Sequence, residues 1–402
     1  MQKKKRKKRA AGGAGYYDFN LLAVVIILVS FGLVMLYSAS AYEAVSDPYI
    51  ADDMYYFKRM AMFSGAGIAL ALVVSRVDYH WAIKLAPLIY VLAFLAMAAV
   101  QFTPLGRTIN GARRWLRIGG SLTMQPSEIA KIAVIVIVPY TIMRIGRNLN
   151  TLRGVMLIIG LGLIQAGAAY AFTDNLSTAV IIMAIAIGVV FIAHPKTKEF
   201  VIIFCSALGA LVIGLIYINA TMTDSTSFRM RRVLAWLQPE NNLDEGGYQV
   251  LQGLYAIGSG GFFGKGLGNS TQKLSTIPEA QNDMIFSIIC EELGLFGAIL
   301  VLILFGYLLY RLFVIAQNAP DLYGTLIVSG IFVHVALQVI LNICVVLNLI
   351  PTTGVTLPFV SYGGTSVLFL MSEVGLALGV ARKIKYNEVE TSRRIDALSK
   401  NN

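Results

Sequence analysis

Long apolar runs, separated by short polar stretches, recur along this chain from about residue 20 to residue 380. A bilayer core needs roughly 20 apolar residues per helix. A segment in lipid must also satisfy its own backbone hydrogen bonds, as a helix does. The pattern therefore predicts an all-α integral membrane protein with about ten transmembrane helices. We place them at residues 20–40, 60–76, 82–102, 127–143, 155–172, 176–193, 200–219, 284–311, 324–347 and 365–381.

The chain outside these runs forms two short tails. We predict a basic N-terminal tail over residues 1–19, one polytopic transmembrane domain over residues 20–381, and a C-terminal tail over residues 382–402. The first run is too long for the core of a signal peptide, and no small-residue cleavage site follows it. Only 14% of the residues are charged, against about 25% in a soluble domain.

Lysine and arginine decide the orientation, because cytoplasmic loops carry an excess of both. An even number of spans puts both termini on one side, and that side is the basic one. Its basic residues are Lys3, Lys4, Lys5, Arg6, Lys7, Lys8, Arg9, Arg76, Lys84, Arg144, Arg147, Arg153, Lys196, Lys198, Arg311, Arg382, Lys383 and Lys385. We predict cytoplasmic termini, with the N-terminal cluster acting as a membrane anchor rather than a nucleic-acid contact.

One predicted outer loop is basic and departs from this rule. Residues 103–126 carry Arg107, Arg113, Arg114 and Arg117. An error in the topology or contact with lipid headgroups would explain them. A functional explanation is an outward-facing anion site, since the planar guanidinium donates two parallel hydrogen bonds to a phosphate.

Two further outer loops have unusual compositions. Residues 220–283 form the longest connection, between the seventh and eighth predicted helices, and its apolar and glycine-rich content indicates order. Residues 348–364 contain no charge, which suggests a re-entrant or interfacial segment. The stretch GSGGFFGKGLGNS (258–270) lacks the spacing of a nucleotide-binding loop, so tight turns explain its glycines better.

Several ionisable or polar side chains fall in or beside the apolar runs, where they usually have a function or a polar partner. Glu279 and Asp283 precede the eighth helix, where a carboxylate is either a general base or part of a helix start. Glu128 and Lys131 are neighbours on one helical face, so Lys131 either pairs with Glu128 or reaches a phosphate. Glu291 and Glu292 lie further along the eighth helix.

The ninth and tenth predicted helices also carry polar groups. His334, Gln338 and Asn342 form a stripe along one face, suited to interhelical hydrogen bonding or to a proton relay. Glu373 has no evident partner in the sequence. The three cysteines, Cys205, Cys290 and Cys344, have no metal-type spacing and imply no disulfide framework.

Taken together, these motifs resemble the shape, elongation, division and sporulation (SEDS) family over nearly the whole chain. The segments that carry the resemblance are YDFNLL (17–22), LYSASA (36–41), NGARRWLRIG (110–119), QPSEIAK (125–131), GYQVLQGLYAIGSGGFFGKGLGNSTQKL (247–274), IPEAQNDMIFSIICEELG (277–294) and PTTGVTLPFVSYGGTS (351–366). Within the family, QKL and TTGVTLPF are typical of the division branch. The elongation branch typically has a proline at the position of Thr356.

The resemblance implies a peptidoglycan glycosyltransferase of the bacterial inner membrane. Such proteins polymerise lipid II into β-1,4 glycan with inversion, and undecaprenyl diphosphate leaves. The family's essential acidic residue corresponds to Asp283, the predicted catalytic base. The predicted substrate-binding residues are Arg113, Arg114, Trp115, Glu128, Lys131, Glu279 and Ser361. Gln281 and Asn282 replace a histidine and a threonine that are common in relatives, so a histidine role there cannot be carried over.

The resemblance also implies partners: lipid II, the growing lipid-linked glycan, a class B penicillin-binding protein and other division proteins, with no nucleic acid. It places the chain at the division septum. No cofactor is firmly implied, and a divalent cation, Mg or Mn, stays open. A lipid II flippase, an elongation or sporulation polymerase and a non-enzymatic scaffold remain alternatives. Lys131, Glu291 and Glu373 keep the transport alternative open.

Overall fold

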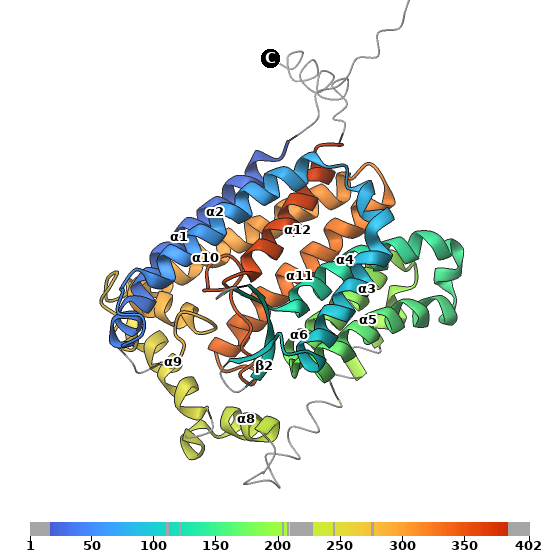
Figure 1. Ribbon diagram of the computed structural model, residues 1–402. Helices are drawn as coiled ribbons and strands as arrows, with labels where there is room; N and C mark the ends of the chain where they lie inside the picture. Colours follow the sequence, from blue (N-terminus) through green and yellow to red (C-terminus); the bar gives the residue numbers. More distant parts are fainter. Residues whose placement is uncertain are drawn as a thin grey trace, which may run out of the picture.

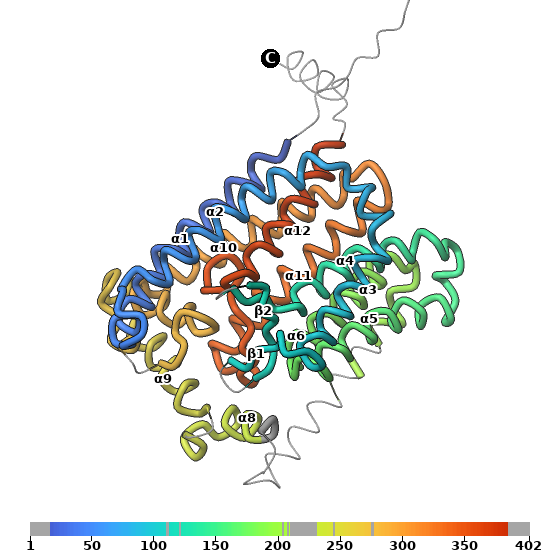
Figure 2. The backbone as a smooth tube through the Cα atoms, in the orientation of Figure 1, coloured from blue at the N-terminus to red at the C-terminus, as the bar shows by residue number. Residues whose placement is uncertain are grey.

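The computed structural model describes residues 17–109, 112–119, 122–202, 205–206, 209, 228–243, 246–274 and 277–384. Long helices pack side by side in one bundle (Figures 1 and 2). The α-helices are α1 (Phe19–Ser46), α2 (Tyr55–Arg76), α3 (His80–Phe102), α4 (Pro126–Ile145), α5 (Leu152–Thr173), α6 (Leu176–Ala193), α8 (Phe228–Leu237), α9 (Gly247–Gly260), α10 (Ile285–Asn318), α11 (Leu322–Val346) and α12 (Ser366–Ala381). The 3-10 helices are η1 (Gly146–Asn150) and η2 (Pro239–Asn241).

Nine of the ten predicted membrane spans coincide with a described helix. Eight of these helices are long and apolar enough to cross a bilayer, and α12 is a shorter apolar helix. The seventh predicted span, residues 200–219, falls largely outside the described residues. The all-α membrane class is therefore confirmed.

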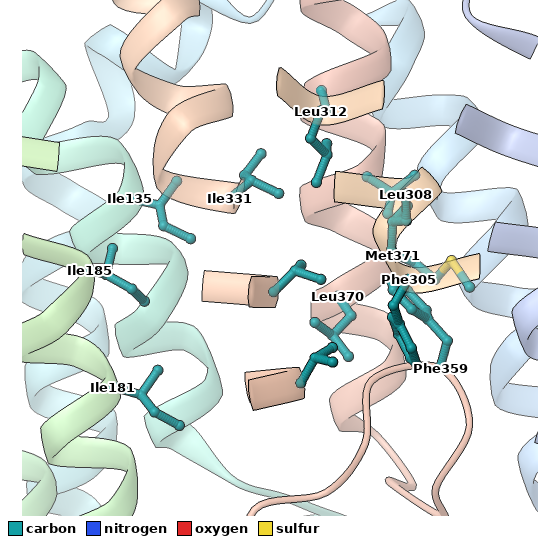
Figure 3. Packing of buried hydrophobic residues seen from close by; sticks show 14 of the residues in the cluster. Ile135, Ile181, Ile185, Phe305, Leu308, Leu312, Ile331, Phe359, Leu370 and Met371 are labelled. Carbon is teal, nitrogen blue, oxygen red and sulfur yellow. The ribbon is translucent and has the colours of Figure 1, made fainter. Parts of the chain in front are cut away.

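The interior of the bundle is formed by branched and aromatic side chains from many helices. Ile135 of α4 lies beside Ile331 of α11, and Ile185 and Ile181 follow along α6, as Figure 3 shows. Burial is most extensive in α4 and α11. These two helices therefore form the centre of the bundle, and the outer helices expose apolar side chains such as Leu163 and Ile303.

A segment between α11 and α12 turns back into the bundle. Val355, Leu357, Phe359 and Val360 are buried. A Cβ added to Gly32, near the middle of α1, would lie 2.6 Å from Val360 Cα. Glycine thus allows the two backbones to approach closely, and this burial against α1 agrees with the re-entrant alternative for residues 348–364.

The basic loop before α4 forms a small antiparallel sheet that the sequence pattern did not reveal. Its strands are β1 (Gly106–Ile109), β2 (Ala112–Gly119) and β3 (Leu122–Met124), in the order β1-β2-β3. The register shifts within both pairings. A strand signal depends on alternating apolar and polar residues, and shifts in such short strands interrupt that alternation.

Helix α10 is broken inside the span that we predicted to be continuous. Gly294 has φ 67° and ψ −166°, outside the helical region. The carbonyls of Glu291 and Glu292 accept hydrogen bonds from Lys265 N and Gly266 N, both at 2.9 Å. Beyond the break, Leu295 N and Phe296 N donate to the carbonyls of Gly261 and Phe262 at 3.0 and 3.1 Å. The loop after α9 therefore replaces the lost helical hydrogen bonds.

Both ends of the described chain lie at one end of the bundle, here called the termini end (Figure 1). An ion pair between Arg311 and Asp18 (2.6 Å) joins α10 to the start of α1 there. Near the end of α12, Lys383 pairs with Asp78. The opposite end carries the β-sheet, α8 and α9 and is called the sheet end. This arrangement agrees with an even number of crossings.

We expect the sheet end to face outward and the termini end to face the cytoplasm. Tyr49, 98% exposed between α1 and α2, reports on the sheet end. Lys198, after α6, reports on the other side. In a background without native cysteines, an impermeant thiol reagent should label Tyr49→Cys in intact cells. It should label Lys198→Cys only after permeabilisation. The reverse pattern would contradict this orientation.

Candidate functional site

The site is centred on Asp283, which immediately precedes α10 and is half-buried. Its carbonyl accepts a hydrogen bond from Asn342 Nδ2 at 2.8 Å, and the same amide donates to Val355 O at 2.8 Å. Gln249 Nε2 of α9 donates to the Asp283 carboxylate at 3.4 Å. Helices α9 and α11 therefore hold this residue directly, and Asn342 links it to the segment that contains Val355.

The environment changes the acidity of the Asp283 side chain. Burial raises the pKa of Asp283 to about 6, and the neighbouring Glu279 carboxylate raises it further, whereas Arg232 opposes the shift. A carboxylate with a pKa just below neutral pH is ionised in the cell and still accepts a proton readily. Asp283 therefore has the acidity expected of a general base.

The loop before Asp283 is tied to its surroundings by polar contacts. Glu279 has a φ of 52°, and its carboxylate accepts a hydrogen bond from Asn282 Nδ2 at 2.9 Å. The carbonyl of the buried Gln281 accepts one from Tyr362 N at 2.9 Å. Gln281 and Asn282, the two departures from the family pattern, thus have structural contacts in this chain.

The two predicted phosphate-binding arginines lie on β2. Arg113 Nη2 donates to Thr103 O at 2.9 Å, and Arg114 Nη2 donates to Asp174 O at 2.8 Å. Within the described residues, the Nε of Arg113 is buried without a hydrogen-bond partner. A guanidinium has five N–H donors, so these contacts leave donor capacity on Arg113 for a ligand. Trp115 follows them and pairs with Arg107 across the sheet.

The other three predicted substrate-binding residues are buried near the start of α4 or in the re-entrant segment. Lys131 Nζ lies 2.9 Å from Glu128 Oε1, and both side chains are almost fully buried. The ion pair is therefore the alternative found for Lys131. Ser361 is 2% exposed, and its hydroxyl accepts a hydrogen bond from Leu357 N at 2.9 Å. Its observed contact supports a turn of the re-entrant segment.

The re-entrant segment connects the Asp283 region to the arginine-bearing sheet. At one point Tyr362 N donates to Gln281 O, and three residues later Thr365 Oγ1 donates to Thr123 O of β3 at 3.2 Å. On the other side of the site, Arg232 of α8 donates to Thr352 O at 3.4 Å. Figure 1 shows all these elements at the sheet end. The structure therefore gathers the predicted carboxylate and arginines at one end of the bundle.

The polar stripe on α11 makes interhelical contacts. Interhelical hydrogen bonding was one of its two predicted uses, and a proton relay was the other. His334 Nδ1 lies 2.8 Å from Glu373 Oε2, which identifies the partner that the sequence did not reveal. Gln338 Nε2 donates to Thr356 O at 3.2 Å.

The sequence did not assign Gln249 and Arg232 to the site, although both have contacts there. Only the folded chain brings α8 and α9 to Asp283.

These features define a class: a polytopic membrane protein with a half-buried carboxylate and a basic sheet at one end. Residues 18–386 match the FtsW/RodA/SpoVE family model, described as cell cycle protein. The chain belongs to this family.

The relatives agree over nearly their whole lengths. Stage V sporulation protein E of Bacillus subtilis is 36% identical over 371 residues, covering 92% of this chain and 98% of that protein. A probable peptidoglycan glycosyltransferase FtsW of Trichlorobacter lovleyi is 35% identical over 378 residues, covering 92% and 94%.

Solved structures share the fold. One belongs to a study of how a peptidoglycan synthase complex coordinates polymerization and crosslinking. It has a TM-score of 0.74 and 29% identity, and covers 92% of this chain and 99% of that chain. The rod shape determining protein RodA of Thermus thermophilus has a TM-score of 0.63 and 27% identity, with 92% and 98% covered.

Proposed function

We propose that this chain is a peptidoglycan glycosyltransferase that polymerises lipid II during septal cell-wall synthesis. Relatives named as probable peptidoglycan glycosyltransferases support the class of enzyme. The observation that carries the proposal is Asp283, a half-buried carboxylate with a pKa raised to about 6, at the same end of the bundle as a basic sheet.

Asp283 acts as the general base in this proposal. Its carboxylate takes the proton of the acceptor hydroxyl while that oxygen bonds to the anomeric carbon of the donor. The bond from this carbon to the diphosphate oxygen breaks, and undecaprenyl diphosphate leaves with the electron pair. Attack opposite to the leaving group inverts the α-linked donor into a β-1,4 glycan. Arg113 and Arg114 hold the diphosphate, and Trp115 packs against a sugar.

Transport across the membrane is less well supported, because the buried charges that favoured it are paired. Lys131 pairs with Glu128, Glu291 with Lys265, and Glu373 hydrogen-bonds to His334. A transport path needs polar groups that exchange partners with a moving substrate. Each of these contacts instead satisfies a charge within the bundle.

A sporulation-specific polymerase is the second candidate. The 36% identity to the Bacillus subtilis sporulation protein favours it as much as the similar identities to FtsW proteins favour division. Both candidates share the chemistry at Asp283. They differ in when and where the protein is used.

The residues around Asp283 do not form a metal cage of their own. No group of three histidine, cysteine, aspartate or glutamate side chains that could hold a metal occurs among the residues that the structure describes. Mg²⁺ at such sites usually takes one or two carboxylates together with substrate phosphates. We therefore assign no reaction step to a cation.

Replacing the base tests the mechanism directly. Asp283→Asn keeps the shape of the side chain but cannot accept the proton, so polymerisation of lipid II should fall about 10²- to 10⁴-fold. The wild-type rate should also fall as the pH drops through about 6, where Asp283 becomes protonated. The folded-state pKa is raised, so ionisation of Asp283 disfavours the folded state, and the asparagine variant should remain at least as stable at pH 7.5.

The control is Asp52→Asn, because Asp52 is an exposed carboxylate paired with Lys58 before α2. It should polymerise at the wild-type rate. Near wild-type polymerisation by folded Asp283→Asn would show that Asp283 is not the base.

Arginine substitutions test the contact with diphosphate. Arg113→Ala and Arg114→Ala should each lower activity at limiting lipid II about 10- to 150-fold, as expected for a charged hydrogen bond worth roughly 1.5–3 kcal/mol. Arg117→Ala, at an exposed position on the same strand, is the control and should change activity little. Unchanged activity in both test variants would exclude this contact.

We further propose that the chain assembles with a class B penicillin-binding protein through the outer-leaflet faces of its helices and residues 220–283. The synthase-complex neighbour and the exposed aromatic side chains of α9, Tyr248 and Tyr255, support an interface there. Co-purification in mild detergent should recover the complex, and the Tyr248→Ala/Tyr255→Ala variant should weaken it. Full polymerase activity without any partner would count against this assembly.

A further inference from the structure

Two consecutive buried glutamates lie immediately before the break in α10. Glu291 and Glu292 both have fully buried side chains. Burying a charge costs several kcal/mol unless it is paired and hydrogen-bonded. Two adjacent buried charges therefore require a dedicated set of partners, which the loop after α9 and helix α1 supply.

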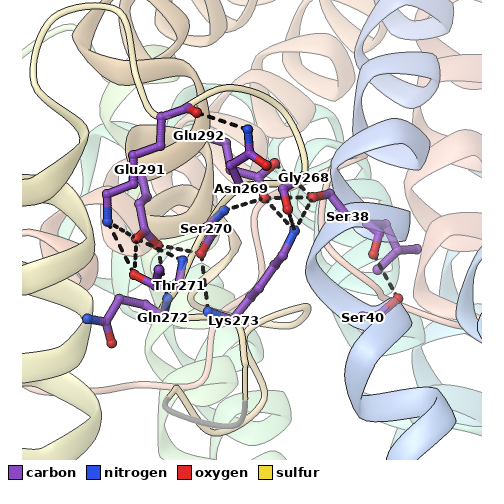
Figure 4. Close-up of polar contacts among 12 residues, drawn as sticks. Ser38, Ser40, Gly268, Asn269, Ser270, Thr271, Gln272, Lys273, Glu291 and Glu292 are labelled. Carbon is purple, nitrogen blue, oxygen red and sulfur yellow. Dashed lines mark hydrogen bonds and ion pairs between the residues drawn. The ribbon is translucent and has the colours of Figure 1, made fainter.

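Glu291 binds the loop after α9. It accepts a hydrogen bond from Lys265 Nζ at 2.6 Å and forms an ion pair with it. It also accepts hydrogen bonds from Thr271 N at 3.1 Å, from Thr271 Oγ1 at 3.0 Å and from the hydroxyl of Ser270. Figure 4 shows the contacts from Ser270 and Thr271 converging on the Glu291 carboxylate.

Glu292 binds in the other direction, toward α1. Its carboxylate accepts a hydrogen bond from Ser38 Oγ at 2.7 Å and from Lys273 Nζ at 2.8 Å. Lys273 Nζ also donates to Ser38 Oγ at 3.0 Å and to Gly268 O at 2.7 Å (Figure 4). We call Glu291, Glu292, Lys265, Lys273 and Ser38 the carboxylate clamp.

The backbone at the clamp leaves no room for side chains. A Cβ added to Gly264 would lie 2.2 Å from Glu292 O, and one added to Gly294 would lie 2.4 Å from Gly264 N. Both glycines have positive φ values, 80° and 67°. The backbones of the loop and of the broken helix thus lie so close together that no side chain fits at Gly264 or Gly294.

This arrangement makes the first part of α10 a separate half-helix, residues 285–293, whose far end is held by the clamp. Asp283 precedes this half-helix, roughly 12 Å from Glu291 at 1.5 Å per residue. Gln249, which contacts the Asp283 carboxylate, lies on α9, and α9 leads directly into the clamp loop. Gln249 lies near one end of α9, and Asp283 precedes the half-helix. The other ends of α9 and of the half-helix meet at the clamp.

We propose that the carboxylate clamp positions the half-helix and α9 relative to each other, so that Asp283 is held in the orientation its reaction requires. Glu291 and Glu292 act through backbone placement and do not touch the substrate. The inference rests on the proposed function, because it names what positions the base of that reaction. A misplacement of about 1 Å can lower a rate about 100-fold.

Neutral variants of the clamp test this proposal. We expect Glu291→Gln to lower kcat about 10- to 100-fold with little change in the KM for lipid II. The acid limb of its pH profile should move to lower pH, since a displaced Asp283 is more solvated. The double variant Glu292→Gln/Lys273→Gln replaces an ion pair by neutral hydrogen-bonding groups. It should show the same effects without leaving an unpaired buried charge.

The matched control is Asp18→Asn, because the pair of Asp18 with Arg311 joins the same two helices at the termini end. It should lower thermal stability to a similar extent and leave kcat and the acid limb unchanged. Folded clamp variants with wild-type kcat and acid limb would overturn the proposal, and so would an equal loss of kcat in Asp18→Asn.

These outcomes are separate from failure of the proposed function. If wild-type protein with its partner does not polymerise lipid II, or if Asp283→Asn remains active, the proposed function itself is wrong. If Asp283→Asn is inactive and the clamp variants are unaffected, the proposed function stands. Only the inference that the clamp positions Asp283 is then wrong.

Discussion

Backbone groups that lack hydrogen-bond partners are costly in lipid, and this cost constrains the break in α10. The arrangement of the sheet end depends on how that break is satisfied. A helix that stops and restarts inside the membrane leaves carbonyl and amide groups without partners, at several kcal/mol each. Here residues 261–266 replace those partners through four backbone hydrogen bonds. Because this loop must approach the helix so closely, glycine is needed at Gly264 and Gly294.

The same constraint explains how polar side chains are distributed through the bundle. Glu128 with Lys131 and His334 with Glu373 are buried as pairs, and the buried Glu291 and Glu292 are paired with the less buried Lys265 and Lys273. The re-entrant segment follows the same rule, since Asn342 and Gln338 of α11 satisfy its carbonyls. Asp283 differs, because among the described residues its carboxylate accepts one long hydrogen bond, from Gln249.

The two ends of the bundle use charge in different ways. At the termini end, Asp18, Asp78, Arg311 and Lys383 form direct ion pairs that join helix ends. At the sheet end, Arg113, Arg114 and Arg232 donate to backbone carbonyls. These contacts orient the three guanidinium groups at the sheet end.

By itself, the sequence determined nine of the described helices and the uncharged character of residues 348–364, and it placed Lys131 on one helical face with Glu128 while leaving the ion pair open. Each depends on local composition or on spacing within one helix. Only the tertiary structure decided the strands of the sheet, the break in α10 and the long-range partners. Ser38 is 254 positions from Glu292, and His334 is 39 from Glu373. Periodicity places a polar group on a helix face, but the group that meets it depends on how all the helices pack.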